Sequence, residues 1–223
     1  MNATILWLMA AGMGIYQGLN PPIGWLRAVG RGLETRSDRA VLLSTGSLAF
    51  GHFLSMAVLL VPVAVIIAGL PGVVLPMSAL MRAGWFISFG LIGFGIYKLI
   101  RPHHPRFIVR IKPNQPLRWS FWMGLAHCGS AVMMVPMLIN LTMVSTMAAD
   151  MTDSATARLG ADAGLAIVLS AAMTVPLFLT GSAMALAVTR RLGIGAITRY
   201  WINLDLGWAA LFIVMGIMGV TMG

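Results

Sequence analysis

Six long runs of apolar residues make up most of this chain, and they limit what it can fold into more than any other feature. The runs cover about residues 4–26, 41–67, 82–101, 118–145, 163–189 and 202–221. A helix needs about 20 mainly apolar residues to cross the hydrocarbon of a bilayer, and each run reaches that length. The sequence therefore predicts an all-α integral membrane protein, with six transmembrane helices in a single domain over residues 1–223.

The overall composition agrees with this class. Hydrophobic residues make up 59% of the chain and charged residues only 9%, whereas soluble domains average about 25% charged residues. A net charge of +9 could indicate a nucleic-acid partner, but the basic residues lie in short segments between the apolar runs. That distribution is typical of topology control and of contact with anionic lipids. We expect membrane lipids as partners, and no nucleic acid.

The basic residues also predict an orientation. The first, third and fifth connections between the runs hold four, six and three Lys or Arg residues, whereas the second and fourth hold only Arg82 and Arg158. By the positive-inside rule the first, third and fifth connections are cytoplasmic, so both termini lie outside the cytoplasm. A count of five helices would break this alternation.

The third and sixth runs share a pattern of glycine and aromatic residues. At one constant offset, Gly84-Trp85, Phe89 and Gly93 match Gly207-Trp208, Phe212 and Gly216. With six spans the two halves of the chain, about 1–101 and 118–223, run in opposite directions, so the match predicts an inverted 3+3 repeat. Proteins with such repeats usually bind substrate near the midplane, on interrupted helices at matching positions of the two halves.

The first run contains a segment that is unusual in a membrane helix, Gly14-Ile15-Tyr16-Gln17-Gly18-Leu19-Asn20-Pro21-Pro22-Ile23-Gly24-Trp25. Its two prolines remove N–H donors and disfavour the helical conformation before them, which leaves backbone carbonyls unpaired. Hydrocarbon tolerates such groups only against protein or beside a wet cavity. The segment is therefore either a kinked helix with closely packed glycines or a broken helix that lines a site. Its counterpart in the second half would be residues 124–130, followed by Pro136.

Glycines in two of the runs are further candidates for close contact between helices, because small residues let membrane helices approach one another. They are Gly12, Gly14 and Gly18 in the first run and Gly90, Gly93 and Gly95 in the third.

Polar side chains from three helices are predicted at a similar depth. With a rise of about 1.5 Å per residue, Gln17 and Asn20 lie at or just cytoplasmic of the midplane, and His52 lies near the centre of its span. His127 falls slightly cytoplasmic of the centre of the fourth span. Ionisable residues at such depth usually face the bundle interior or a cavity. The candidate substrate-binding residues are Gln17, Asn20, His52, His127, Cys128 and Ser130.

The chemistry of these residues leaves the ligand open. Imidazole and thiolate groups suit transition metals, so His52 and His127 are the candidate metal ligands, and the metal would be a substrate rather than a cofactor. Amide oxygens such as those of Gln17 and Asn20 suit harder cations or hydrogen-bonded solutes. The alternative is that each histidine donates one hydrogen bond to a neighbouring helix and only ties the bundle together.

The motifs resemble a known superfamily. Six helices, an inverted repeat and Gly/Pro-interrupted first and fourth helices resemble the superfamily of LysE-type amino-acid exporters, DsbD/CcdA thiol transporters and NicO/UreH-like nickel–cobalt efflux proteins. Gly18-Leu19-Asn20-Pro21, Gly24-Trp25, Gly51-His52 and Ala126-His127 look like a group of uncharacterised bacterial inner-membrane proteins. The resemblance implies a multi-pass protein of the bacterial inner (cytoplasmic) membrane with transporter architecture.

The sequence also departs from these proteins at positions that bear on the chemistry. Gln17 stands where the group's first helix carries a histidine, which weakens a metal site. Cys128 is the only cysteine, so the two-thiol chemistry of the DsbD/CcdA proteins is excluded.

Three classes of function compete. The first is a small secondary transporter or efflux permease for a transition-metal cation or small solute. The second is a non-transporting subunit or assembly factor of a larger membrane complex. The expected protein partners are accordingly further copies in a homo-oligomer or the members of such a complex. The third, an enzyme, is not expected, because the chain has no His-Glu-x-x-His and Gly129-Ser130 lacks the glycine of a Gly-x-Ser-Gly protease motif.

Overall fold

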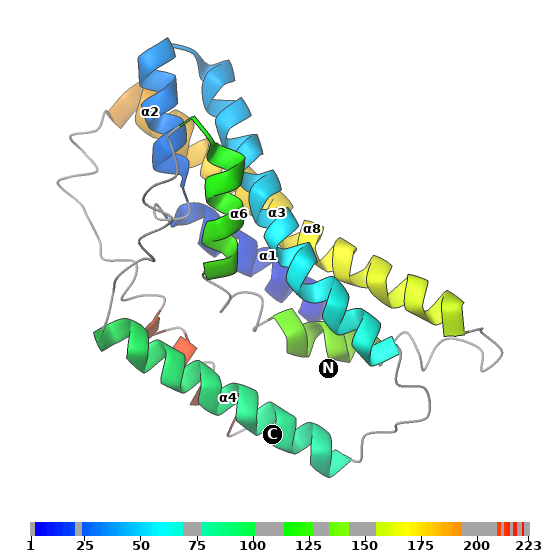
Figure 1. The fold of residues 1–223 in the computed structure, drawn as a ribbon. Coiled ribbons are helices and arrows are strands. Elements are labelled where there is room, and N and C mark those ends of the chain that lie inside the picture. The colour runs from blue at the N-terminus through cyan, green and yellow to red at the C-terminus, as the bar shows by residue number, and fades with distance from the viewer. Residues whose placement is uncertain are drawn as a thin grey trace. The chain divides into compact units, whose positions relative to one another are not determined.

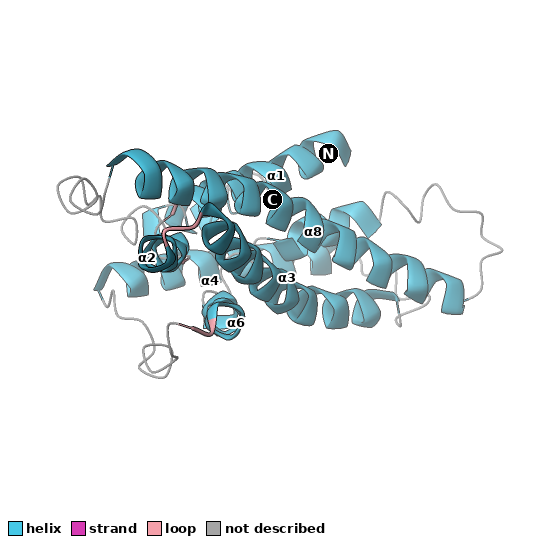
Figure 2. Ribbon diagram, turned by 90° about the horizontal axis from the view of Figure 1, so that it is seen from above, coloured by secondary structure: helices cyan, strands magenta, loops and turns pink. Residues whose placement is uncertain are grey.

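A computed structural model describes most of the chain. The described residues are 3–20, 24–68, 77–100, 114–126, 134–142 and 155–192, with 209, 210, 212–214, 216, 217 and 220. Among them every regular element is a helix and none is a strand (Figure 2), which confirms the all-α fold. Two helices, α3 (Asp38–Ala68) and α8 (Ala155–Ala187), are long and apolar enough to cross a membrane.

The other elements follow the predicted runs with some changes. They are α1 (Ala3–Leu19), α2 (Trp25–Thr35), α4 (Met77–Ile100), α6 (Pro116–Ala126), a helical segment at 134–142 and a π-helical turn η2 (Val188–Leu192) that extends α8. The predicted helix over 4–26 is wrong, because α1 stops at Leu19 and the supposed connection after it is helix α2. The run 118–145 is described as two helical pieces, with 127–133 outside the described residues.

The break in the first run is real. Helix α1 closes with a tight turn in which the backbone N–H of Asn20 donates to the carbonyl of Gln17 at 3.0 Å. The chain resumes at Gly24, whose φ of +121° is unfavourable for any residue with a side chain, and α2 then begins at Trp25. The first run is therefore a broken helix rather than a kinked one. That the break lines a site stays a prediction, and Pro21 and Pro22 themselves lie outside the described residues.

The chain forms two compact units. Unit 1 comprises Met1–Gly69 and Arg106–Trp201, and unit 2 comprises Leu70–Pro105 and Ile202–Gly223. In unit 1 helix α3 packs against both α8 and α6, and α1 packs against α8 (Figure 1).

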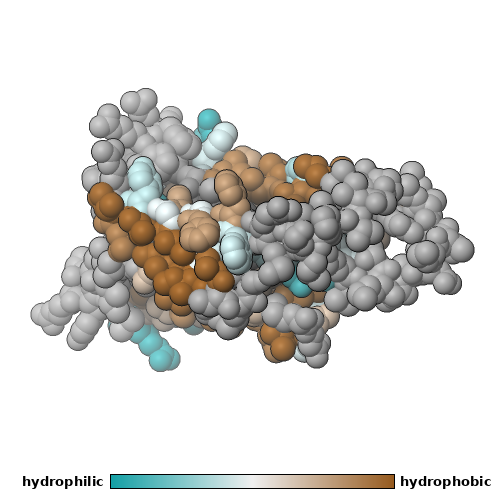
Figure 3. Space-filling view, turned by 90° about the horizontal axis from the view of Figure 1, so that it is seen from below, coloured by the Kyte–Doolittle hydropathy of each residue, from teal (hydrophilic) through white to brown (hydrophobic). Residues whose placement is uncertain are grey.

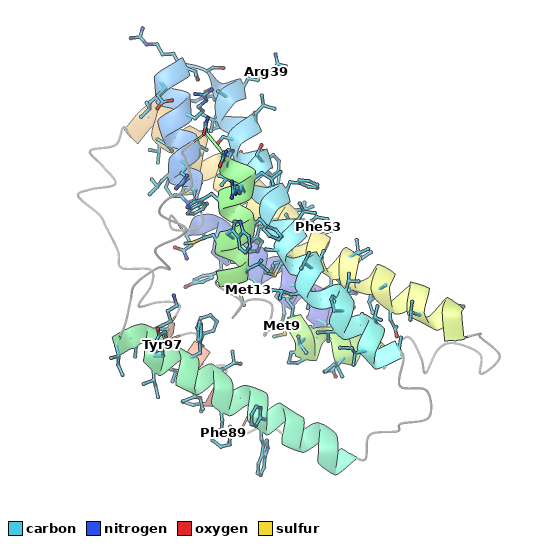
Figure 4. All side chains as sticks on the ribbon, in the orientation of Figure 1. Met9, Met13, Arg39, Phe53, Phe89 and Tyr97 are labelled. Carbon is cyan, nitrogen blue, oxygen red and sulfur yellow. The ribbon has the colours of Figure 1, made fainter. Side chains whose placement is uncertain are left out.

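Contacts along these helices give their relative directions. Gly14 and Gly18 of α1 meet Met173 and Leu177 of α8 in the same order, so α1 and α8 are parallel. Asp38 at the start of α3 pairs with Arg190 just after α8, so α3 and α8 are antiparallel. In Figure 4, Arg39 marks this basic end of α3 and Phe53 its middle. These are the directions that the helices must have if successive spans cross a membrane in alternating directions.

Two apolar clusters form the interior of unit 1. The first, here called the Leu6 cluster, joins residues of α1, α3, segment 134–142 and the first half of α8: Leu6, Ala10, Met56, Leu60, Ala64, Met134, Met137, Leu138, Leu141, Ala166, Leu169 and Met173. The second, the Trp25 cluster, joins α2, the start of α3, α6 and the end of α8: Trp25, Ala28, Val29, Val41, Leu48, Trp119, Met123, Ala185 and Val188.

Unit 2 contains a helix pair with two-fold contact symmetry. A Cβ on Gly95 of α4 would lie 2.7 Å from the Ala209 carbonyl and beside Ile213, and a Cβ on Gly216 would lie 2.5 Å from the Ser88 carbonyl and beside Ile92. Each contact residue has its counterpart 121 positions away: Ser88 and Ala209, Ile92 and Ile213, Gly95 and Gly216. The two helices are therefore antiparallel, and each makes the same contacts with the other.

This symmetry corrects the register of the predicted match between the third and sixth runs. The sequence pattern paired Gly93 with Gly216, but Gly93 has no neighbour near its would-be Cβ, whereas Gly95 and Gly216 make equivalent contacts. Phe89, 58% exposed on α4 (Figure 4), likewise does not correspond to the buried Phe212.

The glycine predictions divide in the same way. Gly14, Gly18 and Gly95 lie at close helix contacts, as expected. Around Gly12 in unit 1, and around Gly90 and Gly93 within unit 2, no described atom lies within 4 Å of where the Cβ would be. Glycine spacing alone could not separate the two groups, since it does not say which face of the helix meets a neighbour.

Candidate functional site

Polar side chains in unit 1 occupy the interval between the two apolar clusters. Gln17 in the last turn of α1 and Asn20 just after it follow the Leu6-cluster residues of α1 and precede Trp25. On α3, His52 and Ser55 fall between Leu48 of one cluster and Met56 of the other. All four polar residues are at most 4% exposed. The helices thus carry a buried polar layer between two apolar ones.

Most hydroxyl groups near this layer are satisfied within their own helix. Ser55 donates to the carbonyl of His52 at 2.7 Å, and Thr174 and Thr180 donate to carbonyls four residues earlier at 2.8 and 2.7 Å. Thr45 Oγ1 and Ser182 Oγ also pair with each other at 2.8 Å, which joins α3 to α8. These residues need no ligand to explain their burial.

The two amides differ from the hydroxyls. Gln17 and Asn20 are each 1% exposed, and Gln17 Oε1 and Asn20 Oδ1 have no hydrogen-bond donor. The one hydrogen bond of the Gln17 side chain runs from Nε2 to the sulfur of Met173 at 3.8 Å. Because sulfur is an acceptor, this contact orients the amide so that the oxygen lies on the other side. A buried carbonyl oxygen without a donor costs on the order of 1–3 kcal/mol, so both oxygens call for a partner.

A small cavity lies beside Gln17. Its volume is about 20 Å³, and about 10–15 Å³ on this measure holds one water molecule. The residues that line it come from the end of α1, the start of α2, α3 and α8: Gln17, Gly18, Trp25, Thr45, Leu48, Leu177, Phe178 and Gly181. The cavity thus lies at the break between α1 and α2, where the unpaired amide oxygen of Gln17 is found.

His52 lies elsewhere in the layer. Its side chain is 4% exposed, and its Nδ1 lies 3.3 Å from the position that a Cβ on Gly124 of α6 would occupy. His52 does not line the cavity, and it lies four to seven residues beyond Leu48 and Thr45, or about 6–10 Å along α3. Gln17 and His52 therefore face different neighbours, α8 and α6, and their use in one site stays a prediction.

Three of the predicted site residues cannot be placed. His127, Cys128 and Ser130 lie outside the described residues, which stop at Ala126 and resume at Met134. Within the part of the chain that the structure describes, no group of three or more His, Cys, Asp or Glu side chains could hold a metal ion. The metal site therefore stays a prediction as well.

The structure adds polar groups that sequence reasoning missed. Trp25 Nε1 and Arg27 Nη1, both in the first turn of α2, are buried donors without an acceptor. Arg27 also lies over the ring of Trp119 in α6, 4.5 Å from its centroid. The sequence placed these residues at the membrane edge, where Trp and Arg are common, so only the break in the helix could have indicated their burial.

Comparisons with protein families, with curated proteins and with solved structures find no match for this chain. The resemblance to the LysE, DsbD/CcdA and NicO/UreH-like superfamily therefore stays a prediction.

Proposed function

We propose that this protein is a small secondary transporter or efflux permease with six membrane-spanning helices, whose substrate site lies at the break between α1 and α2. The observation that carries the proposal is the unpaired, buried amide oxygen of Gln17 beside a cavity at that break. A purely structural helix bundle gains nothing from such an oxygen, whereas a binding site needs it free until the ligand arrives.

The architecture supports the six-span topology. The helix directions in unit 1 agree with spans that alternate across a membrane, and exposed apolar side chains cover much of the described part of the face in Figure 3. The symmetric pair of α4 with residues 209–217 supports an inverted 3+3 repeat. In such a repeat α1 corresponds to α6 and α3 corresponds to α8. The contact between α1 and α8 then has its counterpart in the contact between α6 and α3, and both contacts are present. With both termini outside, such a repeat would rock about the polar layer and expose it to each side in turn.

A transition metal is one candidate substrate, because His52 lies in the polar layer and His127 is predicted there. Whole-cell accumulation of Ni, Co, Zn and Cu in strains with His52→Ala or His127→Ala tests this version. We expect metal accumulation to change in both strains if the metal is exported or imported. Unchanged accumulation and resistance for all four metals would exclude metal transport but not transport of another solute.

The second candidate function is a non-transporting subunit or assembly factor of a membrane complex. Large apolar side chains on α4 favour it, since Phe86 is 83% exposed and Phe89 58% exposed, and such surfaces pack on lipids or on other helices. Purification in a mild detergent separates the two functions. A stoichiometric partner protein supports the subunit, and a monomer or homodimer supports the transporter.

A further inference from the structure

We propose that the guanidinium of Arg27 binds a phosphate group at the cytoplasmic edge of the membrane. The phosphate belongs either to an anionic lipid or to a soluble compound, and both present the same oxyanion to the side chain. This inference goes beyond the proposed function, because it uses the proposed membrane topology but does not depend on transport. Three observations carry it: the missing counter-charge of Arg27, its contact with Trp119 and its place at the start of α2.

Arg27 is a partly buried cation without an anionic partner. Its Nη1 atom is fully buried and has no hydrogen-bond acceptor, and no carboxylate in the described part of the chain forms an ion pair with it. Two exposed arginines do have such partners. Arg31 pairs with Glu34 at 3.4 Å, and Arg190 pairs with Asp38. Since a charge that leaves water without a counter-charge is costly, it is the guanidinium of Arg27 that calls for an anion.

Trp119 of α6 holds the side chain of Arg27 in place. The central carbon of the guanidinium lies 4.5 Å from the centroid of the Trp119 ring, within the range of an attractive cation–π contact. The ring itself is only 8% exposed, and a Cβ on Gly24 would lie 2.5 Å from it. Stacking covers one face of the planar guanidinium. Its N–H groups point outward in the plane, where an oxyanion can accept them.

The start of α2 adds a positive field. The N-terminal end of a helix carries a partial positive charge, which stabilises anions and disfavours cations. The first turn of α2 contains Arg27 and no acidic residue, and its N-cap Gly24 provides no side-chain acceptor. Helix α3, in contrast, has Asp38 in its first turn. An arginine therefore has the unfavourable sign of charge at this position unless an anion accompanies it.

The depth of Arg27 fits a phosphate. Helix α3 has 31 residues, so it is about 46 Å long, close to the thickness of about 40–45 Å of a bilayer with its headgroups. Arg27 lies about 12 Å before the end of α2 at Thr35, and α2 packs beside α3. In the proposed topology this places Arg27 near the boundary between hydrocarbon and headgroups. A long arginine side chain reaches the level of the lipid phosphates from there.

The test is thermal unfolding of the purified full-length protein in a neutral detergent. The micelles are titrated with phosphatidylglycerol or with phosphatidylcholine, and in a separate series sodium phosphate replaces sodium chloride at constant ionic strength and pH. We expect a saturable rise of the melting temperature with phosphatidylglycerol and none with phosphatidylcholine if a lipid supplies the phosphate. A saturable rise with sodium phosphate identifies a soluble phosphate as sufficient.

Variants of two arginines on the same helix separate a specific site from a general effect of charge. Arg27→Gln removes the charge and should raise the half-saturating concentration about tenfold or more, because charge-assisted hydrogen bonds are lost. Arg27→Lys keeps the charge but loses the planar donor fork, so it should lie between Arg27→Gln and the wild type. The matched control is Arg31→Gln, one turn later and exposed, which should leave the half-saturating concentration nearly unchanged.

Two results would overturn the inference. One is a wild-type melting temperature that rises with neither phosphatidylglycerol nor sodium phosphate, which does not depend on whether any variant folds. The other is a phosphate effect that Arg27→Gln leaves intact or that Arg31→Gln weakens equally. Transport by a protein without phosphate binding would remove this site and keep the proposed function, whereas phosphate binding by a protein that moves no solute would do the reverse.

Discussion

At the scale of single residues, the contact between α1 and α8 includes two positions without a side chain. Gly14 lies against the carbonyl group of Met173 and the ring of Pro176. Gly18 lies against Thr180 and Leu177, and a Cβ on Gly18 would lie 2.7 Å from the Leu177 carbonyl oxygen. In both cases the neighbour includes helix backbone, which cannot move aside as a flexible side chain can. The sequence could predict that glycines matter in α1, but not that Gly12 points away from every neighbour.

These positions give a matched pair of variants. Gly14→Ala should destabilise the protein by about 1–3 kcal/mol, because its new methyl group would overlap the Met173 carbonyl. Gly12→Ala, two residues away on the same helix, meets nothing within 4 Å and should be neutral or slightly stabilising. Melting temperatures in detergent measure both. Equal melting temperatures for the two variants would show that α1 does not pack on α8 in this way.

Candidate site residues show the same limit of sequence reasoning. Burial of Gln17 and Asn20 could be predicted, since amides in an apolar run must face protein or a cavity. The neighbours of Gln17 around its cavity could not, because Thr45 looks like an ordinary membrane-helix residue, and depth along a helix does not give its rotation. The depth estimate therefore set Gln17 level with His52, whereas Gln17 shares its cavity with Thr45 and Leu48.

At the scale of elements, the break between α1 and α2 organises unit 1. Gly24 holds its φ of +121° directly against Trp119 of α6, where a Cβ would lie 2.5 Å from the Trp119 ring. Arg27, one turn later, lies over the same ring. The two prolines and three glycines predicted an interruption, but the helix after it was missed because four arginines between 27 and 39 are typical of a cytoplasmic loop.

The break can also be tested through the stability of the protein. Gly24→Ala should destabilise the protein by about 1–3 kcal/mol, since an alanine is strained at this φ and its methyl group would overlap Trp119. Gly30→Ala, in the middle of α2 with nothing within 4 Å, is the control and should keep the wild-type melting temperature. A Gly24→Ala protein as stable as the control would mean that α2 does not start from this strained position.

At the scale of the whole molecule, the six-span topology makes a prediction about sidedness. In a background with Cys128→Ser, Glu34→Cys near the end of α2 should be cytoplasmic and Gly160→Cys near the start of α8 should face outward, and both positions are open in the structure. An impermeant thiol reagent applied to intact cells should therefore label residue 160 only, and residue 34 after permeabilisation. Labelling of both from one side would contradict the alternation on which the inverted repeat depends.

The central claim is that water reaches the break at Gln17 and Asn20 during a transport cycle, so that the break is a site rather than a dry structural kink. The direct measurement is the rate at which a positively charged methanethiosulfonate reagent modifies Gln17→Cys, Asn20→Cys or Ala10→Cys, each with Cys128→Ser, in the membrane. Ala10 is 0% exposed in the Leu6 cluster on the same helix and should stay unmodified. The account predicts at least tenfold faster modification at 17 and 20 than at 10, and equal rates at all three positions would contradict it.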